Sequence, residues 1–230
     1  MKGICKRYPG VQALNNANLT VKKGEIHCLM GENGAGKSTL IKILAGAEHM
    51  DKGDILFNGE KVFLTKPEHA LKIGISFIYQ ELNVIEPLTV EDNITLGFEY
   101  TNYALINRKK NLETVTEILK ELHLAINPRA MVRTLTVPQK QMMLIAKAFS
   151  RNSKLIVLDE PTAALTDRET KELFRLIGQL KEKGVSFLFI SHRFEDVFTI
   201  GDAITVYRDG KTIGTVPTAE TIQDDIIRMM

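Results

Sequence analysis

The sequence predicts an α/β fold with a mainly parallel central sheet, and three observations support this prediction. Short apolar runs alternate with stretches of helical periodicity, the pattern of strands connected by helices. One such run, EIHCLM (25–30), leads into a glycine-rich loop and then a helical segment. Two turn signals, Asn58-Gly59 and Asp209-Gly210, lie between short strand-like segments and predict antiparallel hairpins. We therefore expect a parallel core sheet together with an antiparallel β part.

The first two thirds of the chain divide into a strand-rich and a helix-rich part. Residues 11–21 predict a half-buried strand, and 37–45 predict a helix after the glycine-rich loop. Apolar residues then recur at helical spacing over 107–124. Few strand signals occur between residues 89 and 151, so this part of the chain predicts a helical subdomain.

The last third returns to alternating strands and helices. Thr166 and Glu169 form a capping box at the start of a predicted helix over 167–183, and Gly184 ends that helix. The other expected elements are strands at 155–158, 185–190, 203–208 and 211–216 and a final helix over about 218–230.

The composition limits the class of protein. The net charge of +2 and the pI of about 8.4 are too balanced to indicate a nucleic-acid partner. Cys5 and Cys28 lie far apart without metal spacing, which favours a reduced, cytosolic setting. No apolar run is long enough to span a bilayer, and the N-terminal residues lack the apolar core of a signal peptide. We expect a soluble protein that could still dock onto a membrane protein.

The strongest chemical signal is GENGAGKST (31–39), which fits the phosphate-loop pattern G-x-x-x-x-G-K-[ST]. Its glycines allow a tight turn whose N–H groups surround a phosphate, and the next helix adds its positive N-terminal end. Lys37 supplies a charge for the β- and γ-phosphates, and Ser38 supplies a hydroxyl for Mg²⁺. The alternative is a glycine-rich turn without a ligand. The preceding strand and following helix favour nucleotide binding.

The second signal is LIVLDEPT (155–162), a buried strand that ends in two carboxylates. In phosphate-loop enzymes an Asp at this place holds Mg²⁺, a role that falls here to Asp159. Glu160 is then placed to act as general base on the attacking water. A pair of solvated charges at a strand end is the competing interpretation, and the upstream phosphate loop makes it the weaker one.

Three single residues narrow the class of nucleotide hydrolase. Gln80 follows the apolar strand ISFIY, and His192 follows VSFLFI. Both lie just past the carboxyl end of a strand, where ligands collect in open α/β sheets. Tyr8 could stack on a purine ring. Taken singly, each is better explained as a surface, capping or core residue, so only their combination with the two motifs indicates function.

In this order and spacing, the motifs resemble the nucleotide-binding domain of ABC transporters over nearly the whole chain. The resemblance implies a phosphate-loop ATPase core over about 1–88 and 152–230, with an antiparallel β part and an inserted helical subdomain over about 89–151. The segment LTVPQ (135–139) occupies the place of the family signature LSGGQ. The other matching stretches are KRYPG, GENGAGKST, YQE, LIVLDEPT, AALT and ISHR.

More narrowly, the chain resembles the first half of bacterial monosaccharide import ATPases. GICKRYPGVQAL, IYQELN, EPTAALT and VYRDGK carry this likeness. Such ATPases usually contain two nucleotide-binding halves in one chain of about twice this length. Because the motifs here are intact, we expect this chain to be the first half and a fragment of a longer tandem protein.

The resemblance implies a role for each site residue. Glu160 would orient the hydrolytic water, His192 would contact the γ-phosphate, and Gln80 would serve catalysis. Ser38, Gln80 and Asp159 would serve Mg²⁺ directly or through water. Thr136, Val137, Pro138 and Gln139 would act on ATP bound by the partner half. The residues expected to bind ATP are Tyr8, Val11, Asn33, Gly34, Ala35, Gly36, Lys37, Ser38, Thr39 and Asp159.

The resemblance also implies partners. A second nucleotide-binding half, in the same chain or in a homodimer, would close head to tail around two ATP molecules. Closure would move membrane permease subunits through residues 81–97, and a periplasmic sugar-binding protein would act indirectly. The chain would then lie at the cytoplasmic face of the inner membrane. The alternative is a non-transport ABC ATPase of translation or DNA maintenance, although no coiled coil, basic arm or large insert is visible.

Two residues depart from the family pattern. Thr166 replaces the Asp that commonly ends the AALT segment, and its place as a helix cap explains it locally. Pro138 replaces a glycine of the signature. Thr136 and Gln139 predict a capping box there, so Pro138 would lie in the first helical turn and break no helix hydrogen bond. It lacks the N–H that would face the γ-phosphate, so we expect a weakened partner site.

Overall fold

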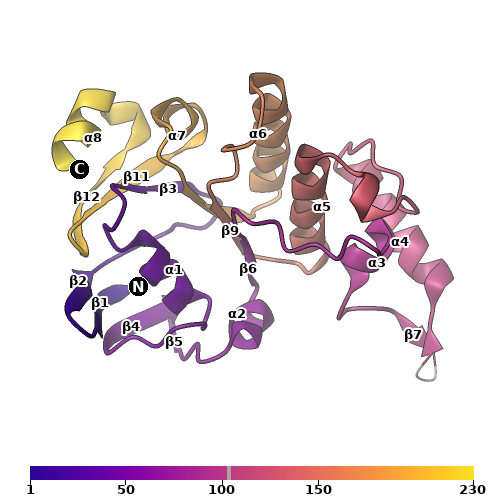
Figure 1. Ribbon diagram of the computed structural model, residues 1–230, viewed down its shortest axis with the longest axis horizontal. Coiled ribbons are helices and arrows are strands. Elements are labelled where there is room, and N and C mark those ends of the chain that lie inside the picture. Colours follow the sequence, from indigo (N-terminus) through magenta and orange to yellow (C-terminus); the bar gives the residue numbers. More distant parts are fainter. Residues whose placement is uncertain (103–104) are drawn as a thin grey trace.

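A computed structural model describes residues 1–102 and 105–230 of the protein. Its centre is a six-stranded sheet in which five strands are parallel and the edge strand β12 is antiparallel (Figure 1). In spatial order the strands are β12 (Lys211–Pro217), β11 (Ala203–Arg208), β3 (Ile26–Gly31), β10 (Ser186–Ile190), β9 (Leu155–Asp159) and β6 (Ile75–Ile78). The expected parallel core is therefore confirmed.

The β3 strand shows why this sheet is central. Its side chains alternate between two hydrophobic clusters, with Cys28 and Met30 in one and Leu29 in the other. All three side chains are fully buried, so both faces of the strand are covered. A strand covered on both faces usually has a nearly continuous apolar sequence, and EIHCLM has this character apart from its Glu and His.

The antiparallel sheet lies beside this core and supplies one wall of the phosphate-loop region. It contains the predicted Asn58-Gly59 hairpin, and α1 (Lys37–Leu44) packs into the hydrophobic cluster that joins it to the core. Its strands, in spatial order, are β2 (Val11–Ala17), β1 (Lys2–Tyr8), β4 (Lys52–Phe57) and β5 (Glu60–Val62).

The helices between residues 89 and 151 extend to one side of the core sheet (Figure 1). They are α3 (Val90–Thr95), α4 (Arg108–Glu121) and α5 (Val137–Ser150), with a short 3₁₀ turn at Val132–Thr134. The helical periodicity over 107–124 thus corresponds to α4. A short pair, β7 (Thr101–Asn102) and β8 (Leu105–Ile106), was not predicted, because two-residue strands carry no periodic signal.

The remaining helices cover the core sheet. They are α2 (Pro67–Ile73), α6 (Asp167–Glu182), α7 (Phe194–Ile200) and α8 (Gln223–Met229). The capping box of Thr166 and Glu169 at the start of α6 is confirmed. The predicted start of the final helix, at about residue 218, was wrong. Thr218–Glu220 is a 3₁₀ turn, and Thr221 and Ile222 are extended. Both extended residues are β-branched, which disfavours helix at that point.

In residues 1–102 and 105–230, no helix combines the length and apolar character needed to cross a membrane. Cys5 and Cys28 are both free thiols.

A series of hydrogen-bonded polar side chains is buried inside the core sheet. His27 on β3 is 1% exposed, with its Nδ1 2.6 Å from Glu25 Oε1 and its Nε2 2.7 Å from Thr205 Oγ1. Burial lowers the pKa of His27, and the Glu25 carboxylate opposes this effect. The imidazole therefore has less tendency to protonate in the folded chain than in the unfolded one.

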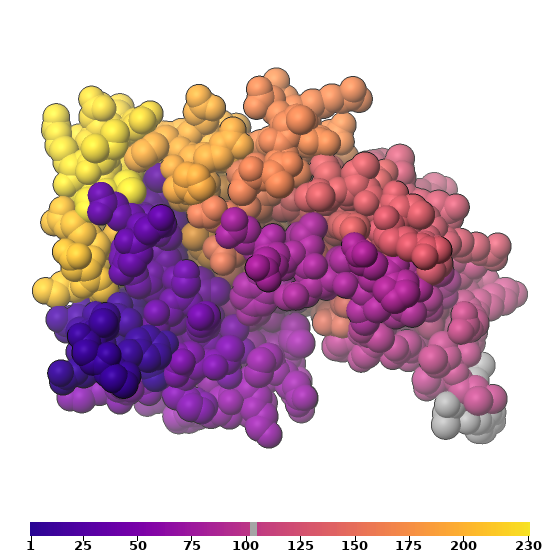
Figure 2. Space-filling model, viewed as in Figure 1, coloured from indigo at the N-terminus to yellow at the C-terminus, as the bar shows by residue number. Residues whose placement is uncertain are grey.

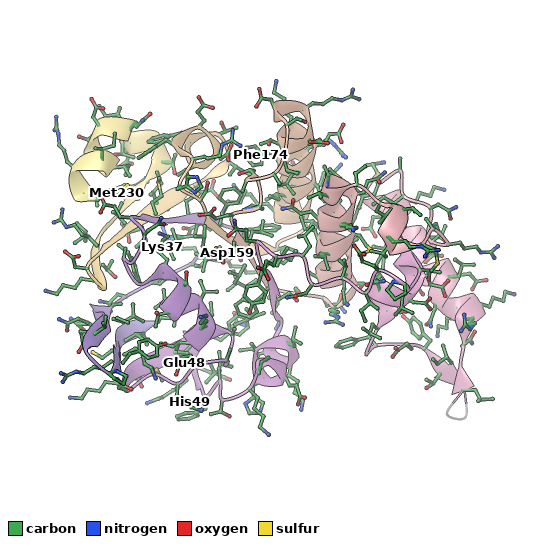
Figure 3. All side chains as sticks on the ribbon, viewed as in Figure 1. Lys37, Glu48, His49, Asp159, Phe174 and Met230 are labelled. Carbon is green, nitrogen blue, oxygen red and sulfur yellow. The ribbon has the colours of Figure 1, made fainter. Side chains whose placement is uncertain are left out.

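This pKa shift predicts a pH dependence of stability. Because the pKa of His27 is lower in the folded state, protonation favours unfolding, and the free energy of unfolding should fall as the pH drops below about 6.5. His27→Gln cannot titrate, so urea unfolding at about pH 7.5 and 5.5 should show a smaller decrease than in the wild type. The exposed His49, labelled in Figure 3, provides a matched control, since His49→Gln should follow the wild type. Parallel curves for His27→Gln and the wild type would contradict the prediction.

Candidate nucleotide site

The glycine-rich loop connects β3 to α1 through two positions that exclude a side chain. A Cβ on Gly31 (φ +150°) would lie 2.3 Å from the carbonyl oxygen of Tyr207. A Cβ on Gly36 (φ +99°) would lie 2.7 Å from the carbonyl oxygen of Ala13. Gly36 is also the N-cap of α1 and contributes no capping side chain. The positive end of α1 is therefore open toward an anion.

This loop forms one wall of a cavity of about 540 Å³. The cavity contains every predicted residue of the loop from Asn33 to Thr39, together with Val11, Gln80, Asp159 and Glu160. Five further residues line it that the sequence did not indicate as site residues, namely Gln12, Ala13, Ile190, Asp209 and Gly210. In the sequence, Asp209-Gly210 indicates only a hairpin turn. The Gly210 N–H donates to the Ala35 carbonyl at 3.2 Å, and this contact places the turn beside the phosphate loop. No local pattern in the sequence predicts such a contact.

Lys37 lies at the start of α1, and its side chain turns back over the loop. Its Nζ donates to the carbonyl oxygens of Gly31 at 2.6 Å and Glu32 at 3.0 Å. Burial lowers the pKa of Lys37, while the charges of Glu160 and Asp159 raise it. Figure 3 shows Lys37 to the left of Asp159, in the part of the molecule that contains the two sheets. A bound polyphosphate would strengthen the charged state of this amine.

The two carboxylates at the end of β9 have different environments. Burial raises the pKa of Asp159, and the neighbouring Glu160 charge raises it further. Glu160 has a left-handed backbone (φ +47°), and its N–H donates to the Ile190 carbonyl at 2.9 Å. Such a backbone is unfavourable for a residue with a side chain and persists only where the surroundings hold it.

His192 follows β10 and contacts the carboxylate of Glu160. Its Nδ1 lies 2.9 Å from Glu160 Oε1, while 64% of its side chain is exposed. His192 does not line the cavity, so Glu160 connects it to the nucleotide site. The sequence placed each residue at a strand end, and the parallel pairing of β9 and β10 brings them together.

Tyr8 ends β1 and pairs there with Val11, which lines the cavity, but Tyr8 itself does not line it. Its hydroxyl donates to Glu48 Oε2 at 3.1 Å, and the Lys6 Nζ lies 5.2 Å from its ring centroid. Lys6 also pairs with Glu48 at 2.7 Å. The ring is therefore held by a network of charged groups that the sequence did not indicate.

The segment 135–139 lies apart from this cavity. Thr136 caps α5, with its Oγ1 accepting from the Gln139 N–H at 3.4 Å and its N–H donating to Gln139 Oε1 at 3.0 Å. The predicted capping box is confirmed, and Pro138 lies in the first turn without breaking a helix bond. Val137 is 48% exposed. None of these residues lines the cavity.

The donor set fits a magnesium nucleotide better than an isolated metal ion. Ser38, Gln80 and Asp159 all line the cavity that contains the phosphate loop. Across the described part of the chain, no group of three or more His, Cys, Asp and Glu side chains could hold a metal. Mg²⁺ commonly uses one or two carboxylates together with substrate phosphates, which matches this site.

Comparison with known proteins identifies the family. A family model described as "ABC transporter" matches residues 14–163. The galactose/methyl galactoside import ATP-binding protein of Clostridium perfringens is 46% identical over 100% of this chain and 45% of its own length. The corresponding Escherichia coli protein is 47% identical, and a ribose import ATP-binding protein of Rubrobacter xylanophilus is 46% identical; each is matched over 46% of its length. This chain thus spans about half the length of these relatives.

Solved structures agree on the fold. The ADP conformation of an ATP-binding cassette of an ABC transporter aligns with a TM-score of 0.86 and 26% identity, over 99% of this chain and 96% of that one. A dimeric cassette bound to ADP and Pi aligns with a TM-score of 0.79 and 25% identity, over 94% and 97%. With its phosphate loop, its paired strand ends and these likenesses, the chain belongs to the ABC transporter family and has the fold of its ATP-binding cassettes.

Proposed function

We propose that this chain binds and hydrolyses ATP to power a bacterial importer of a monosaccharide. The observation that carries the proposal is the pairing of Glu160 with His192 at the edge of a cavity that also contains Lys37. The names of the relatives, which are sugar import ATP-binding proteins, favour import over the alternative role in translation or DNA maintenance.

ATP would enter the cavity with its phosphates on the loop. The N–H groups of Asn33 to Thr39 would surround them, and Lys37 would exchange its carbonyl contacts for phosphate oxygens. Tyr8 and Val11 would face the adenine. Mg²⁺ would neutralise phosphate charge when bound, held by Ser38, Asp159 and, with water, Gln80.

Hydrolysis would depend on Glu160. At the edge of the cavity, its carboxylate is held by His192 Nδ1, and its backbone is held by the N–H bond to the Ile190 carbonyl. From there it would accept a proton from the water that attacks the γ-phosphate. His192 is exposed enough to contact the γ-phosphate as well.

A second cassette would complete each ATP site. The dimeric solved cassettes support such an arrangement. Thr136, Val137, Pro138 and Gln139 lie away from this chain's cavity and would meet the ATP of the partner cassette. Because Pro138 has no N–H, that site would be weaker than the one served by Glu160.

Movement would pass to permease subunits through the helical subdomain, which we place at about 89–151, and through residues 81–97. A groove of about 230 Å³ lies between α2 and α5, lined by Leu71, Tyr79, Leu144 and Lys147. Figure 2 shows an indentation between α2 and the helical part of the chain. A permease segment would dock there, at the cytoplasmic face of the membrane, and a periplasmic sugar-binding protein would deliver the sugar.

The first test concerns the general base. Glu160→Gln should bind ATP normally but hydrolyse it at least about tenfold more slowly, because the amide cannot accept the proton. Single-turnover hydrolysis and a nucleotide titration measure the two effects separately. Glu182→Gln, at an exposed position on α6, is the matched control and should keep wild-type rates. Unchanged turnover in Glu160→Gln would reject the catalytic role.

The second test concerns phosphate binding. Lys37→Ala removes the amine that reaches over the loop, so ATP affinity measured by calorimetry should fall by at least about tenfold. Lys42→Ala changes an exposed lysine on the same helix and should bind ATP normally. Tight binding by Lys37→Ala would contradict the assignment of the loop.

The third test concerns the signature segment. Pro138→Ala returns an N–H to the first turn of α5 while the capping box remains. ATP-dependent association of the cassettes should therefore strengthen by about two- to tenfold, the worth of one net hydrogen bond. Sedimentation of a Glu160→Gln background, with and without ATP, would measure this change. Equal association of both forms would show that the missing N–H does not weaken the partner site.

A further inference from the structure

The loop that follows the end of β9 is held at three consecutive residues by three different elements. The Glu160 N–H donates to the Ile190 carbonyl on β10 at 2.9 Å. The Pro161 carbonyl accepts from Gln141 Nε2 on α5 at 2.7 Å. The Thr162 hydroxyl donates to Asp196 Oδ2 on α7 at 2.5 Å. The backbone of Glu160 is thus over-determined, as its left-handed conformation requires.

The middle contact differs from the other two. The bonds to β10 and α7 stay within elements of the core, whereas Gln141 lies on α5, the helix that Thr136 caps. Gln141 is 4% exposed, and Pro161 is also buried. The Pro161 carbonyl would lose its donor if α5 moved, and a buried carbonyl without a donor is costly. The position of α5 and that of the loop after Glu160 are therefore mutually dependent.

We propose that Gln141 is a positioning residue that couples the signature end of α5 to the general base Glu160. This inference rests on the proposed function, since it needs Glu160 as the base and residues 136–139 at the partner's ATP. When the partner site draws the start of α5 toward its nucleotide, Gln141 carries the displacement to Pro161. The state of one ATP site thereby sets the geometry of the base in the other.

A purely structural role predicts a different result from the same contact. A bond that only stabilises the packing of α5 would affect the unfolding temperature and leave catalysis intact, or would reduce activity whether or not Glu160 is present. A positioning role acts through Glu160 alone. The two explanations are therefore separated by a double-mutant cycle between positions 141 and 160.

The experiment uses the natural full-length protein and the variant Gln141→Met, which keeps the length of the side chain and removes the donor. We expect kcat for ATP hydrolysis to fall by at least about tenfold, with KM for ATP changed by less than about twofold. The cooperativity of hydrolysis with ATP concentration should also decrease. In a Glu160→Gln background, Gln141→Met should cause no further loss.

The neighbouring residue provides the matched control. Lys140 also joins α5 to another segment, through an ion pair with Glu86 at 2.6 Å. Lys140→Met breaks that contact without touching the loop after Glu160, so it should keep kcat and cooperativity near wild type. An equal loss in Lys140→Met would mean that any weakened contact of α5 suffices, and would overturn the specific role of Gln141.

A second variant keeps the test decisive if Gln141→Met does not fold. In Gln141→Glu the burial of the carboxyl should raise its pKa, and the protonated form can again donate to Pro161. Its kcat relative to wild type should therefore rise as the pH falls from about 8.5 to 6. A flat ratio, or a Gln141→Met enzyme with normal kcat, would overturn the proposal. If Glu160→Gln itself hydrolysed ATP at the normal rate, the proposed function would fail instead.

Discussion

Close approach of backbones around the phosphate loop is the constraint on which the nucleotide site depends. At Gly31 the carbonyl of Tyr207 on β11, and at Gly36 the carbonyl of Ala13 on β2, leave no room for a Cβ. The two glycines thus let the core sheet and the antiparallel sheet close on the same loop. This closure places Val11 and Asp209 in the cavity beside Lys37. A side chain at either glycine would separate these walls as well as strain the loop.

The electrostatics of the cavity complement this geometry. Burial lowers the pKa of Lys37 and raises that of Asp159, so each group is pushed toward its neutral form. Their mutual charges act in the opposite direction. A nucleotide with Mg²⁺ would supply the charges that both groups face, phosphate oxygens for the amine and the cation for the carboxylate. The phosphate oxygens and the cation would then stabilise the charged forms of these two buried groups, and this stabilisation would strengthen nucleotide binding.

The helical part of the chain packs on the core sheet through a shared hydrophobic cluster and also contacts the site through a polar bond. The capping box of Thr136 fixes the start of α5 and makes Pro138 compatible with the fold. Five residues later, Gln141 donates to the Pro161 carbonyl, next to Glu160 in the chain. Under the proposed function, a substitution at the start of this helix would therefore have two separate effects, one on the contact with a partner nucleotide and one on the orientation of Glu160.

Local rules allowed much of the fold and site to be predicted. The phosphate loop, the strand ends followed by Gln80 and His192, and the two predicted capping boxes follow from residues a few positions apart, since turns and helix termini are set by nearby backbone groups. Short elements such as α3 and β7 gave too few residues for a periodic signal. The extended Thr221 and Ile222 also show how a helical pattern can begin later than expected.

The sequence by itself determined that this chain carries a phosphate loop followed by strand-end carboxylates, because those motifs are contiguous. Only the tertiary structure decided that His192 bonds to Glu160, that Glu48 holds Tyr8, and that Gln141 meets Pro161. These pairs lie 32, 40 and 20 residues apart in the chain. Their contacts depend on how strands pair and helices pack, which no local pattern of residues specifies.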